Sequence, residues 1–223
     1  MSGTHSNNNA FRLPAEIVEQ CELAQRIVRK ELLPLEPEFL PHPGHSFGLK
    51  ETINLKSVFG EEKTNHLIKI ARDTGLWYLM VPEEFGGSGL PMLAQVAILE
   101  QFYYTAVPFP FANVPNILYE CQGDQIERFL KPVIEGEKTT CFAQTEPNAG
   151  SDPGGMMQTR AVKKGDHWVL NGAKLFITNG LHADLYFVAA RTGPGRHDIS
   201  MFIVDKGTPG STLGRPLAKT GWR

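Results

Sequence analysis

The sequence has few cysteines and no long hydrophobic run. Cys21, Cys121 and Cys141 show no CxxC or Cys/His spacing, which favours three buried small hydrophobes in a reducing compartment over disulfides or a zinc site. The apolar stretches fall far short of the about 20 residues that span a bilayer. The Asn-rich start has no basic region followed by an apolar one. We therefore expect no membrane partner, no secretory signal and a cytoplasmic location.

The chain also has no excess of either charge. Its 22 Lys and Arg against 24 Asp and Glu give a net charge of −2, which argues against nucleic acid as a partner. With 41% hydrophobic and 21% charged residues, the 223-residue composition is that of an ordinary globular protein. One large domain or two small ones are expected at this length.

Several catalytic and binding motifs are missing. The sequence contains no GxGxxG after a predicted strand, no GxxxxGK[ST], no HExxH and no GxSxG. These absences exclude the P-loop and serine-hydrolase interpretations. The seven histidines are scattered without metal-ligand spacing, so we predict no metal site.

The first half of the chain has helical periodicity. Apolar residues recur at steps of three and four between Pro14 and Pro34, which predicts an amphipathic helix. The Pro-rich stretch 36–47 predicts a loop, and residues 61–74 predict a second helix that Gly75 ends. A third helix is expected after Pro91, with Leu93, Val96 and residues 99–102 facing inward. A short fourth helix is expected over residues 124–129, bent or ended near Pro132.

From about Thr139 the apolar period changes from 3.6 to 2, which predicts a β domain. Residues 158–164 and 167–170 flank Gly165-Asp166 as a hairpin would. Further strands are expected over the segments 173–178, after the Asn171-Gly172 turn, 185–190 and 199–204. The predicted organisation is a disordered tail over residues 1–13, a helical domain over 14–136 and a β domain over 137–223.

Two stretches are candidates for ligand binding. The loop Cys141–Gly155 is rich in Gly, Ser, Thr and Asn, which lets a backbone approach a ligand and offer N–H groups and hydroxyls to it. The stretch Phe176–Gly180 offers an aromatic ring and a hydroxyl, which suit a flat conjugated ligand. A connection between domains explains the composition of the first stretch equally well, and ordinary strand packing explains the second.

The motifs TEPNAGSD (residues 145–152), NGAKLFITNG (residues 171–180) and PEEFGG (residues 82–87) resemble those of the acyl-CoA dehydrogenase family. The resemblance implies an α+β multidomain fold, in which an N-terminal all-α domain precedes an antiparallel β-barrel or sandwich domain. The final residues, 219–223, resemble the KxGxR found near the end of that β domain. We therefore expect the C-terminal helical domain of the family to be absent.

The resemblance also implies FAD as cofactor and a set of residues that contact it. Thr145 is expected near the pyrimidine edge of the flavin, and Thr178 near its N5 atom. Phe176 replaces the usual Trp, which keeps a ring but loses the indole N–H. Ser151 is expected to reach the CoA portion of the substrate, although a loop-capping role explains it too. The full expected FAD set is Phe142, Ala143, Gln144, Thr145, Gly150, Ser151, Phe176, Ile177 and Thr178.

The activity that the resemblance implies is the α,β-dehydrogenation of an acyl-CoA thioester in fatty acid β-oxidation. A glutamate removes the α-proton while the β-hydrogen leaves as hydride to flavin N5. Because that glutamate lies in the domain expected to be absent, no acidic residue is assigned as the base. Glu146 is expected to be structural, and Glu83 and Glu84 to be solvated.

The implied partners are an acyl-CoA substrate, an electron-transfer flavoprotein as acceptor and further polypeptides. The further polypeptide is either a second copy of this chain, in a homo-oligomer, or a different chain that supplies the helical domain, in a hetero-oligomer. Two alternatives stay open beside a dehydrogenase component. One is a non-catalytic truncated flavin-binding or interaction module. The other is an acyl-CoA oxidase or flavin monooxygenase on the same scaffold, which fold-level analogy cannot separate.

Overall fold

The computed structural model of the chain describes residues 13–39 and 55–217, which form two compact units. The first comprises the described residues up to 111 and the second comprises residues 112–217. The predicted tail before residue 13, most of the predicted loop 36–47 and the KxGxR at 219–223 lie outside the described residues. The domain boundary expected after residue 136 stays a prediction.

Helix α1 (Ala15–Ile27) follows Pro14, as predicted. It continues through a π-helical turn (Val28–Leu32) and a 3-10 turn (Leu33–Leu35) into helix α2 (Glu36–Phe39). The loop expected from residue 36 is therefore wrong at its start. Pro37 is compatible with α2 because it lies in the first turn of that helix, where a backbone N–H has no intrahelical partner. Ile17, Cys21 and Ala24 of α1 and Val28 and Leu32 of the π-helical turn, which recur at the predicted steps, are buried, and Ile27 is buried beside them.

Helix α3 (Leu55–Asp73) begins earlier than predicted, and its backbone is kinked at Gly60, which has a φ of 77°. Gly75 follows this helix with a φ of 75°, so the predicted glycine stop is confirmed. The PEEFGG stretch forms a 3-10 turn (Glu83–Phe85). A Cβ at Gly87 would lie 1.8 Å from the Val81 carbonyl oxygen, so only glycine fits there.

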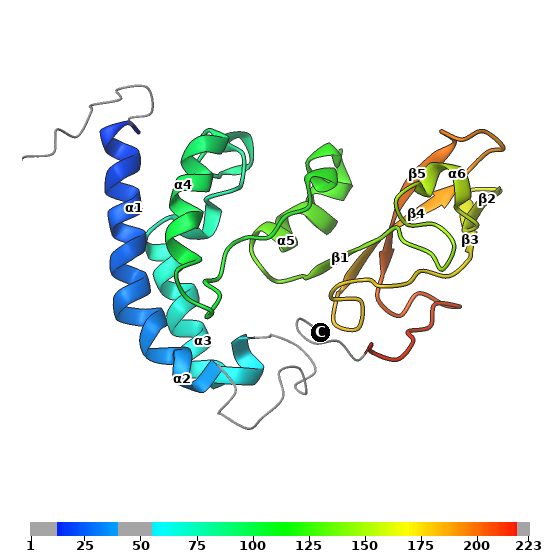
Figure 1. Cartoon of the computed structure of the whole chain (residues 1–223). Coiled ribbons are helices and arrows are strands. Elements are labelled where there is room, and N and C mark those ends of the chain that lie inside the picture. Colours follow the sequence, from blue (N-terminus) through cyan, green and yellow to red (C-terminus); the bar gives the residue numbers. More distant parts are fainter. Residues whose placement is uncertain (1–12, 40–54, 218–223) are drawn as a thin grey trace, which may run out of the picture. The chain divides into compact units, whose positions relative to one another are not determined.

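Helix α4 (Met92–Phe102) follows Pro91 as predicted and lies beside α1 (Figure 1). The prediction of its inward face is wrong for Leu93 and Val96, which are 64% and 55% exposed. The helix is apolar on nearly every side, so periodicity could not identify the buried face. Tertiary packing selects the face that carries Ala94, Ile98 and Phe102.

The second unit begins with a 3-10 turn (Asn116–Glu120), a π-helical turn (Ile126–Leu130) and helix α5 (Lys131–Ile134). Of the two outcomes expected near Pro132, a bend or an end, the end is wrong, because the helical segment continues to Ile134. Pro132 lies in the first turn of α5, the part of a helix that tolerates proline. Buried apolar side chains anchor this segment: Phe129, Leu130, Val133 and Ile134.

A five-stranded mixed sheet follows, formed by β1 (Thr140–Ala143), β2 (Arg160–Lys164), β3 (His167–Asn171), β4 (Leu185–Arg191) and β5 (Ile199–Asp205). The strand β4 pairs in antiparallel fashion with β5 and in parallel with β1 and, at Arg191, with β2. The predicted β2–β3 hairpin is confirmed, and Gly165 in its turn has a φ of 63°.

The order of a helical part before a β part is confirmed, but two details of the β part differ from expectation. The sheet over residues 140–205 is mixed and open, whereas an antiparallel barrel or sandwich was expected. No strand forms over residues 173–178. That segment pairs its backbone and side chains with the loop after β1, so it does not extend the sheet ladder.

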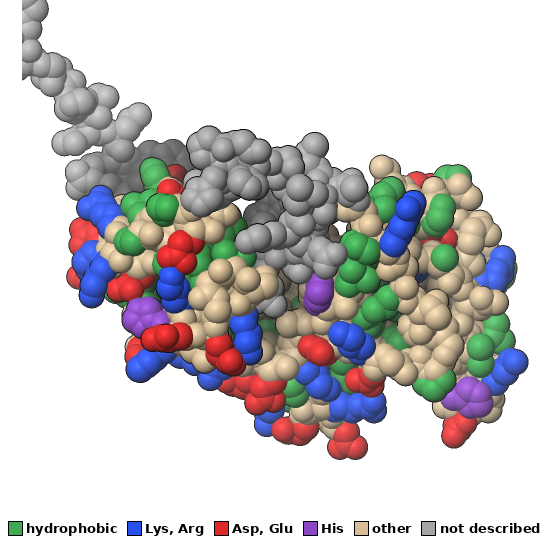
Figure 2. All heavy atoms as spheres, turned by 90° about the horizontal axis from the view of Figure 1, so that it is seen from below, with side chains coloured by type: hydrophobic (Ala, Val, Ile, Leu, Met, Phe, Trp, Pro, Cys, Tyr) green, Lys and Arg blue, Asp and Glu red, His purple; other side chains and the backbone are tan. Residues whose placement is uncertain are grey.

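All three cysteines are free and buried, as predicted. Burial raises the pKa of the Cys141 thiol to about 11, so this thiol is protonated at neutral pH. Cys141 packs with Ala183 and Tyr186 in the core of the sheet. Within the described ranges, no helix is both long and apolar enough to cross a membrane. Figure 2 shows acidic and basic side chains interspersed on one face of the molecule, as a near-neutral net charge suggests.

Candidate functional site

The loop between β1 and β2 leaves and rejoins the same edge of β4. Strand β5 pairs along the whole of one β4 edge, so β1 and β2 pair with the opposite edge, β1 along residues 185–188 and β2 at Arg191. Residues 144–159 connect these two positions. The Arg191 N–H donates to the Thr159 carbonyl at 2.8 Å, which fixes the end of the loop.

A tight turn forms the first part of this loop. Glu146 N–H donates to the Ala149 carbonyl at 2.9 Å, and Ala149 N–H donates back to the Glu146 carbonyl at 3.2 Å. Pro147 and Asn148 lie exposed at the tip of the turn. The exchange of two hydrogen bonds fixes the turn, and with it the backbone next to Thr145.

The Glu146 carboxylate is buried, and both of its oxygens accept hydrogen bonds. It accepts hydrogen bonds from the Gln158 N–H at 2.6 Å, the Thr159 N–H at 3.0 Å and Lys174 Nζ at 2.8 Å. Burial raises the pKa of this carboxyl, but Lys174 and the two backbone N–H groups outweigh burial and hold the pKa at about 2. At neutral pH Glu146 is therefore a structural anion.

A second segment, residues 172–180, crosses against the loop. The Leu175 N–H donates to the Thr145 carbonyl at 2.8 Å, and Asn179 Nδ2 donates to the Thr140 carbonyl at 3.0 Å. At Gly172 a Cβ would lie 2.6 Å from the Thr159 Cα, so the close approach requires glycine. The two candidate ligand-binding stretches of the sequence are thus held side by side.

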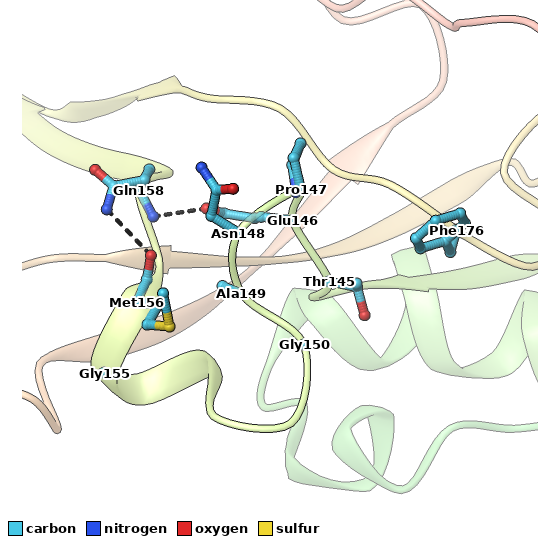
Figure 3. A pocket seen from close by; sticks show the side chains of 10 residues that line it. All are labelled: Thr145, Glu146, Pro147, Asn148, Ala149, Gly150, Gly155, Met156, Gln158 and Phe176. Carbon is cyan, nitrogen blue, oxygen red and sulfur yellow. Dashed lines mark hydrogen bonds between the residues drawn. The ribbon is translucent and has the colours of Figure 1, made fainter.

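Phe176 has an unusual backbone conformation. Its φ is 60°, the left-handed region that bulky residues rarely adopt, and its side chain is 67% exposed. Such strain persists only where the surroundings impose it, and it concentrates at functional sites. Here the adjacent Leu175 hydrogen bond holds the backbone while the Phe176 ring borders an open cavity (Figure 3).

The later part of the loop is held by charged groups. Helix α6 (Pro153–Met156) begins at Asp152, whose carboxylate accepts from the Gly155 N–H at 3.2 Å and from Arg196 Nη2 at 2.7 Å. Arg191 Nη2 donates to the Gly154 carbonyl at 2.8 Å. These contacts fix the backbone of α6, whose Gly155 borders the cavity.

The cavity has a volume of about 820 Å³, within the size range of small-molecule sites. Small, amide-bearing and apolar groups surround it, and Glu146 is the one ionisable residue among them. Figure 3 shows the lining set: Thr145, Glu146, Pro147, Asn148, Ala149, Gly150, Gly155, Met156, Gln158 and Phe176. The walls suit a flat, largely neutral ligand with polar edges, because an exposed ring faces hydroxyl and amide groups.

The structure brings together three of the nine predicted FAD residues at this cavity, namely Thr145, Gly150 and Phe176. Ala143 is buried in the sheet, and Ile177 packs against the Cys141 cluster. The Gln144 carbonyl accepts from Lys174 Nζ at 3.0 Å. The remaining three, Phe142, Ser151 and Thr178, are exposed and lie outside the lining set.

Six lining residues did not belong to the predicted FAD set and were not weighed as a base: Pro147, Asn148, Ala149, Gly155, Met156 and Gln158. Asn148 and Gly155 lie inside the Gly-rich loop that the sequence singled out, and Met156 directly follows it, so that loop was the available signal. Gln158 gave no such signal, because the sequence placed it at the start of a predicted strand, whereas β2 begins at Arg160.

Two family models match the chain and together cover most of it. The N-terminal domain of acyl-CoA dehydrogenases matches residues 50–137, and the middle domain matches residues 141–223. These two models agree with the change of periodicity near Thr139.

Individual relatives extend this result. The chain is 39% identical to an acyl-CoA dehydrogenase of Bacillus subtilis over 173 residues, covering 72% of this chain and 45% of the relative. It is 30% identical to (R)-benzylsuccinyl-CoA dehydrogenase of Thauera aromatica over 224 residues, covering 95% and 54% respectively. The chain therefore spans about half the length of the curated relatives it matches.

The fold has a solved counterpart. A crystal structure of a probable acyl-CoA dehydrogenase from Mycobacterium abscessus matches with a TM-score of 0.73 and 29% identity. The match covers 94% of this chain and 53% of the solved chain. The arrangement of helices and mixed sheet is thus found in a larger protein of that description.

Proposed function

Because the chain belongs to the acyl-CoA dehydrogenase family, we propose that its cavity holds the isoalloxazine ring of FAD. The chain then takes part in the α,β-dehydrogenation of an acyl-CoA thioester. The hydrogen bond from the Leu175 N–H to the Thr145 carbonyl carries this proposal. It joins the two motifs of the family resemblance at one cavity.

The residues present fit a flavin. The Phe176 ring is exposed and offers an aromatic face, and Gly150 has open space where a Cβ would stand. Thr145, Asn148 and Gln158 supply a hydroxyl and amides for the polar edges of a conjugated ring. The lining has no cationic side chain, so phosphate groups are expected to depend on backbone N–H groups or on residues outside the lining.

In this proposal the residues of the chain bind the flavin and the substrate and orient them. Thr145 fixes the pyrimidine edge of the ring, and Phe176 packs on the ring and excludes water from it. The family resemblance implies that Thr178 would contact flavin N5 and that Ser151 would contact the CoA portion of the substrate, from exposed positions outside the lining set. When bound, FAD supplies the hydride acceptor of the reaction.

No described residue is assigned as the base that removes the α-proton. Glu146 is the one acid that lines the cavity, but all its carboxylate hydrogen bonds are internal and its pKa of about 2 makes it a poor proton acceptor at neutral pH. Glu83 and Glu84 are exposed in the first unit. The proposal therefore assigns binding and orientation to this chain and leaves proton abstraction unassigned.

The proposed partners follow from the family. They are an acyl-CoA, an electron-transfer flavoprotein as acceptor and at least one further polypeptide in an oligomer. An exposed apolar face on and after α4 supports association, since Met92, Leu93, Val96, Tyr103 and Tyr104 are 55–83% exposed. The same face favours a second candidate function, a flavin-binding or interaction module without turnover. The cytoplasm and fatty acid β-oxidation stay the expected setting.

The first experiment is flavin binding by the purified chain. We expect FAD to co-elute with the protein on gel filtration and to give the visible flavin absorbance. Phe176→Ala should weaken FAD binding by about tenfold, the loss of a ring contact worth about 1.4 kcal/mol. Tyr103→Ala is the matched control, because it removes another highly exposed aromatic ring, from the first unit.

Two outcomes oppose the proposal. Chain that is folded by circular dichroism but retains no FAD at any concentration would contradict the flavin site. Equal losses in the Phe176 and Tyr103 variants would place the flavin elsewhere. Anaerobic addition of acyl-CoA then tests turnover by the chain alone. Bleaching of the flavin would indicate substrate oxidation and contradict a binding module, whereas unchanged absorbance is expected of a flavin-binding component that needs a further polypeptide for proton abstraction.

A further inference from the structure

The Lys174 side chain is buried at the junction between the two segments that form the cavity. Its ammonium donates to the Gln144 carbonyl at 3.0 Å and to Glu146 Oε1 at 2.8 Å. The Lys174 and Glu146 side chains are only 10% and 3% exposed. Burial lowers the pKa of the Lys174 ammonium, and Glu146 acts in the opposite direction.

Both partners are close in sequence to residues that line the cavity. Glu146 directly follows Thr145, and Lys174 lies two residues before Phe176. The Leu175 N–H, between Lys174 and Phe176, donates to the Thr145 carbonyl. The Lys174 side chain therefore connects the residues on either side of Thr145 with the segment that carries Phe176.

The Glu146 carboxylate extends this connection to a third chain segment. It accepts from the N–H groups of Gln158 and Thr159, where the loop returns to the sheet. Gln158 is itself a lining residue. One buried ion pair thus connects three of the walls that surround the cavity.

We propose that Lys174 is a positioning residue, which sets the separation of Thr145 and Phe176 by bridging the Gln144 carbonyl and the Glu146 carboxylate. It touches no ligand in this role and acts through the walls of the cavity. This positioning role rests on the proposed function only in the test that measures FAD binding.

The alternative is that the pair serves stability alone. Breaking a buried pair leaves an uncompensated charge and destabilises the fold, whereas neutralising both partners is often close to neutral. Lys174→Met breaks the pair and leaves the Glu146 charge unpaired. The double variant Lys174→Met with Glu146→Gln neutralises both partners, so no charge stays buried. The amide oxygen of the new Gln still offers an acceptor to a backbone N–H.

The first readout needs no flavin. Amide hydrogen exchange in the full chain reports local opening at Leu175, Gln158 and Thr159. We expect exchange at Leu175 to be about tenfold faster in the double variant, because local opening of this segment needs less free energy once the ion pair is gone. Lys174→Arg should keep slow exchange, since a guanidinium can reach the same two acceptors. Lys63→Met is the control, since its partner Glu38 is exposed.

The second readout is FAD affinity and the quenching of flavin fluorescence. We expect the double variant to bind FAD about tenfold more weakly while it unfolds at nearly the wild-type urea concentration. Lys174→Arg should restore both binding and quenching.

The outcomes separate the two claims. Unchanged Leu175 exchange in the double variant overturns the positioning role, whether or not FAD binds. Losses that follow the free energy of unfolding across all variants overturn it too, because they indicate a purely structural pair. Faster exchange in a chain that never binds FAD supports the positioning role and contradicts the proposed function alone.

Discussion

Arg191 Nη2 donates to the carbonyl oxygen of Gly154 at 2.8 Å, although the two residues are 37 positions apart in the sequence. The same guanidinium donates through Nη1 to the Gly195 carbonyl at 2.6 Å and through Nε to the Met157 carbonyl at 3.3 Å. A planar fork of donors can satisfy three carbonyls at fixed angles. Arg191 thereby ties the cavity loop to the connection between β4 and β5.

Replacing Arg191 by Met should loosen this loop without removing the sheet. We expect the free energy of unfolding to fall by about 1–3 kcal/mol, because partly buried carbonyls lose charge-assisted donors. Exchange of the amides at residues 152–157 should accelerate, as measured by mass spectrometry. Arg191→Lys should recover little, since a point charge cannot reach all three acceptors.

The control for this prediction is Arg29→Met. Arg29 is exposed on the π-helical turn of the first unit, and its loss should change the free energy of unfolding by less than about 0.5 kcal/mol. If Arg191→Met also changed stability by so little and left the exchange of residues 152–157 unaltered, the three hydrogen bonds would not hold the loop.

The sequence was most informative where one residue type satisfies a backbone requirement. Gly75 after α3 and Gly165 in the β2–β3 turn both have positive φ, as their patterns indicated. Leu93 and Val96 show the opposite case. Their spacing fitted an inward face, but α4 is apolar nearly all round, so only packing against α1 could decide which side is buried.

The candidate site was predictable as two motifs but not as one cavity. Residues 173–178 have the aromatic and β-branched content of a strand after a turn, yet the Leu175 N–H pairs with the Thr145 carbonyl in a loop, which local propensity does not reveal. Lys174 has the sequence context of an ordinary exposed lysine. Its burial depends on Glu146, 28 residues away, and such a distant pair is invisible without an alignment or a structure.

The depressed pKa of Glu146 predicts a loss of stability in acid. Its folded-state pKa of about 2 lies below the ordinary value of 4.5. Its contribution is therefore complete above pH 4.5 and decreases as the pH falls toward 2, by about 3 kcal/mol in total at 1.36 kcal/mol per pH unit. Urea unfolding at a series of pH values between 7 and 3 measures this slope.

Glu146→Gln should flatten the acid limb of this stability profile, because the amide does not titrate. Glu62→Gln, an exposed carboxylate in α3, is the control and should keep the wild-type slope. An acid limb that is equally steep in the Glu146 variant would show that other carboxylates cause the acid sensitivity.

The two faces of α4 give the most direct stability test of the packing. Ile98 is fully buried while Leu93, five residues earlier on the same helix, is 64% exposed. Truncating Ile98 to Ala should cost about 2–5 kcal/mol through lost burial and a cavity, whereas Leu93→Ala should change the free energy of unfolding by less than about 1 kcal/mol. Both values come from urea unfolding of the full chain. Because the two variants remove side chains of equal size from one helix, helix propensity and the unfolded state contribute similarly to each. Their difference therefore reports burial, and a Leu93 cost equal to that of Ile98 would mean that the exposed face of α4 is covered in solution.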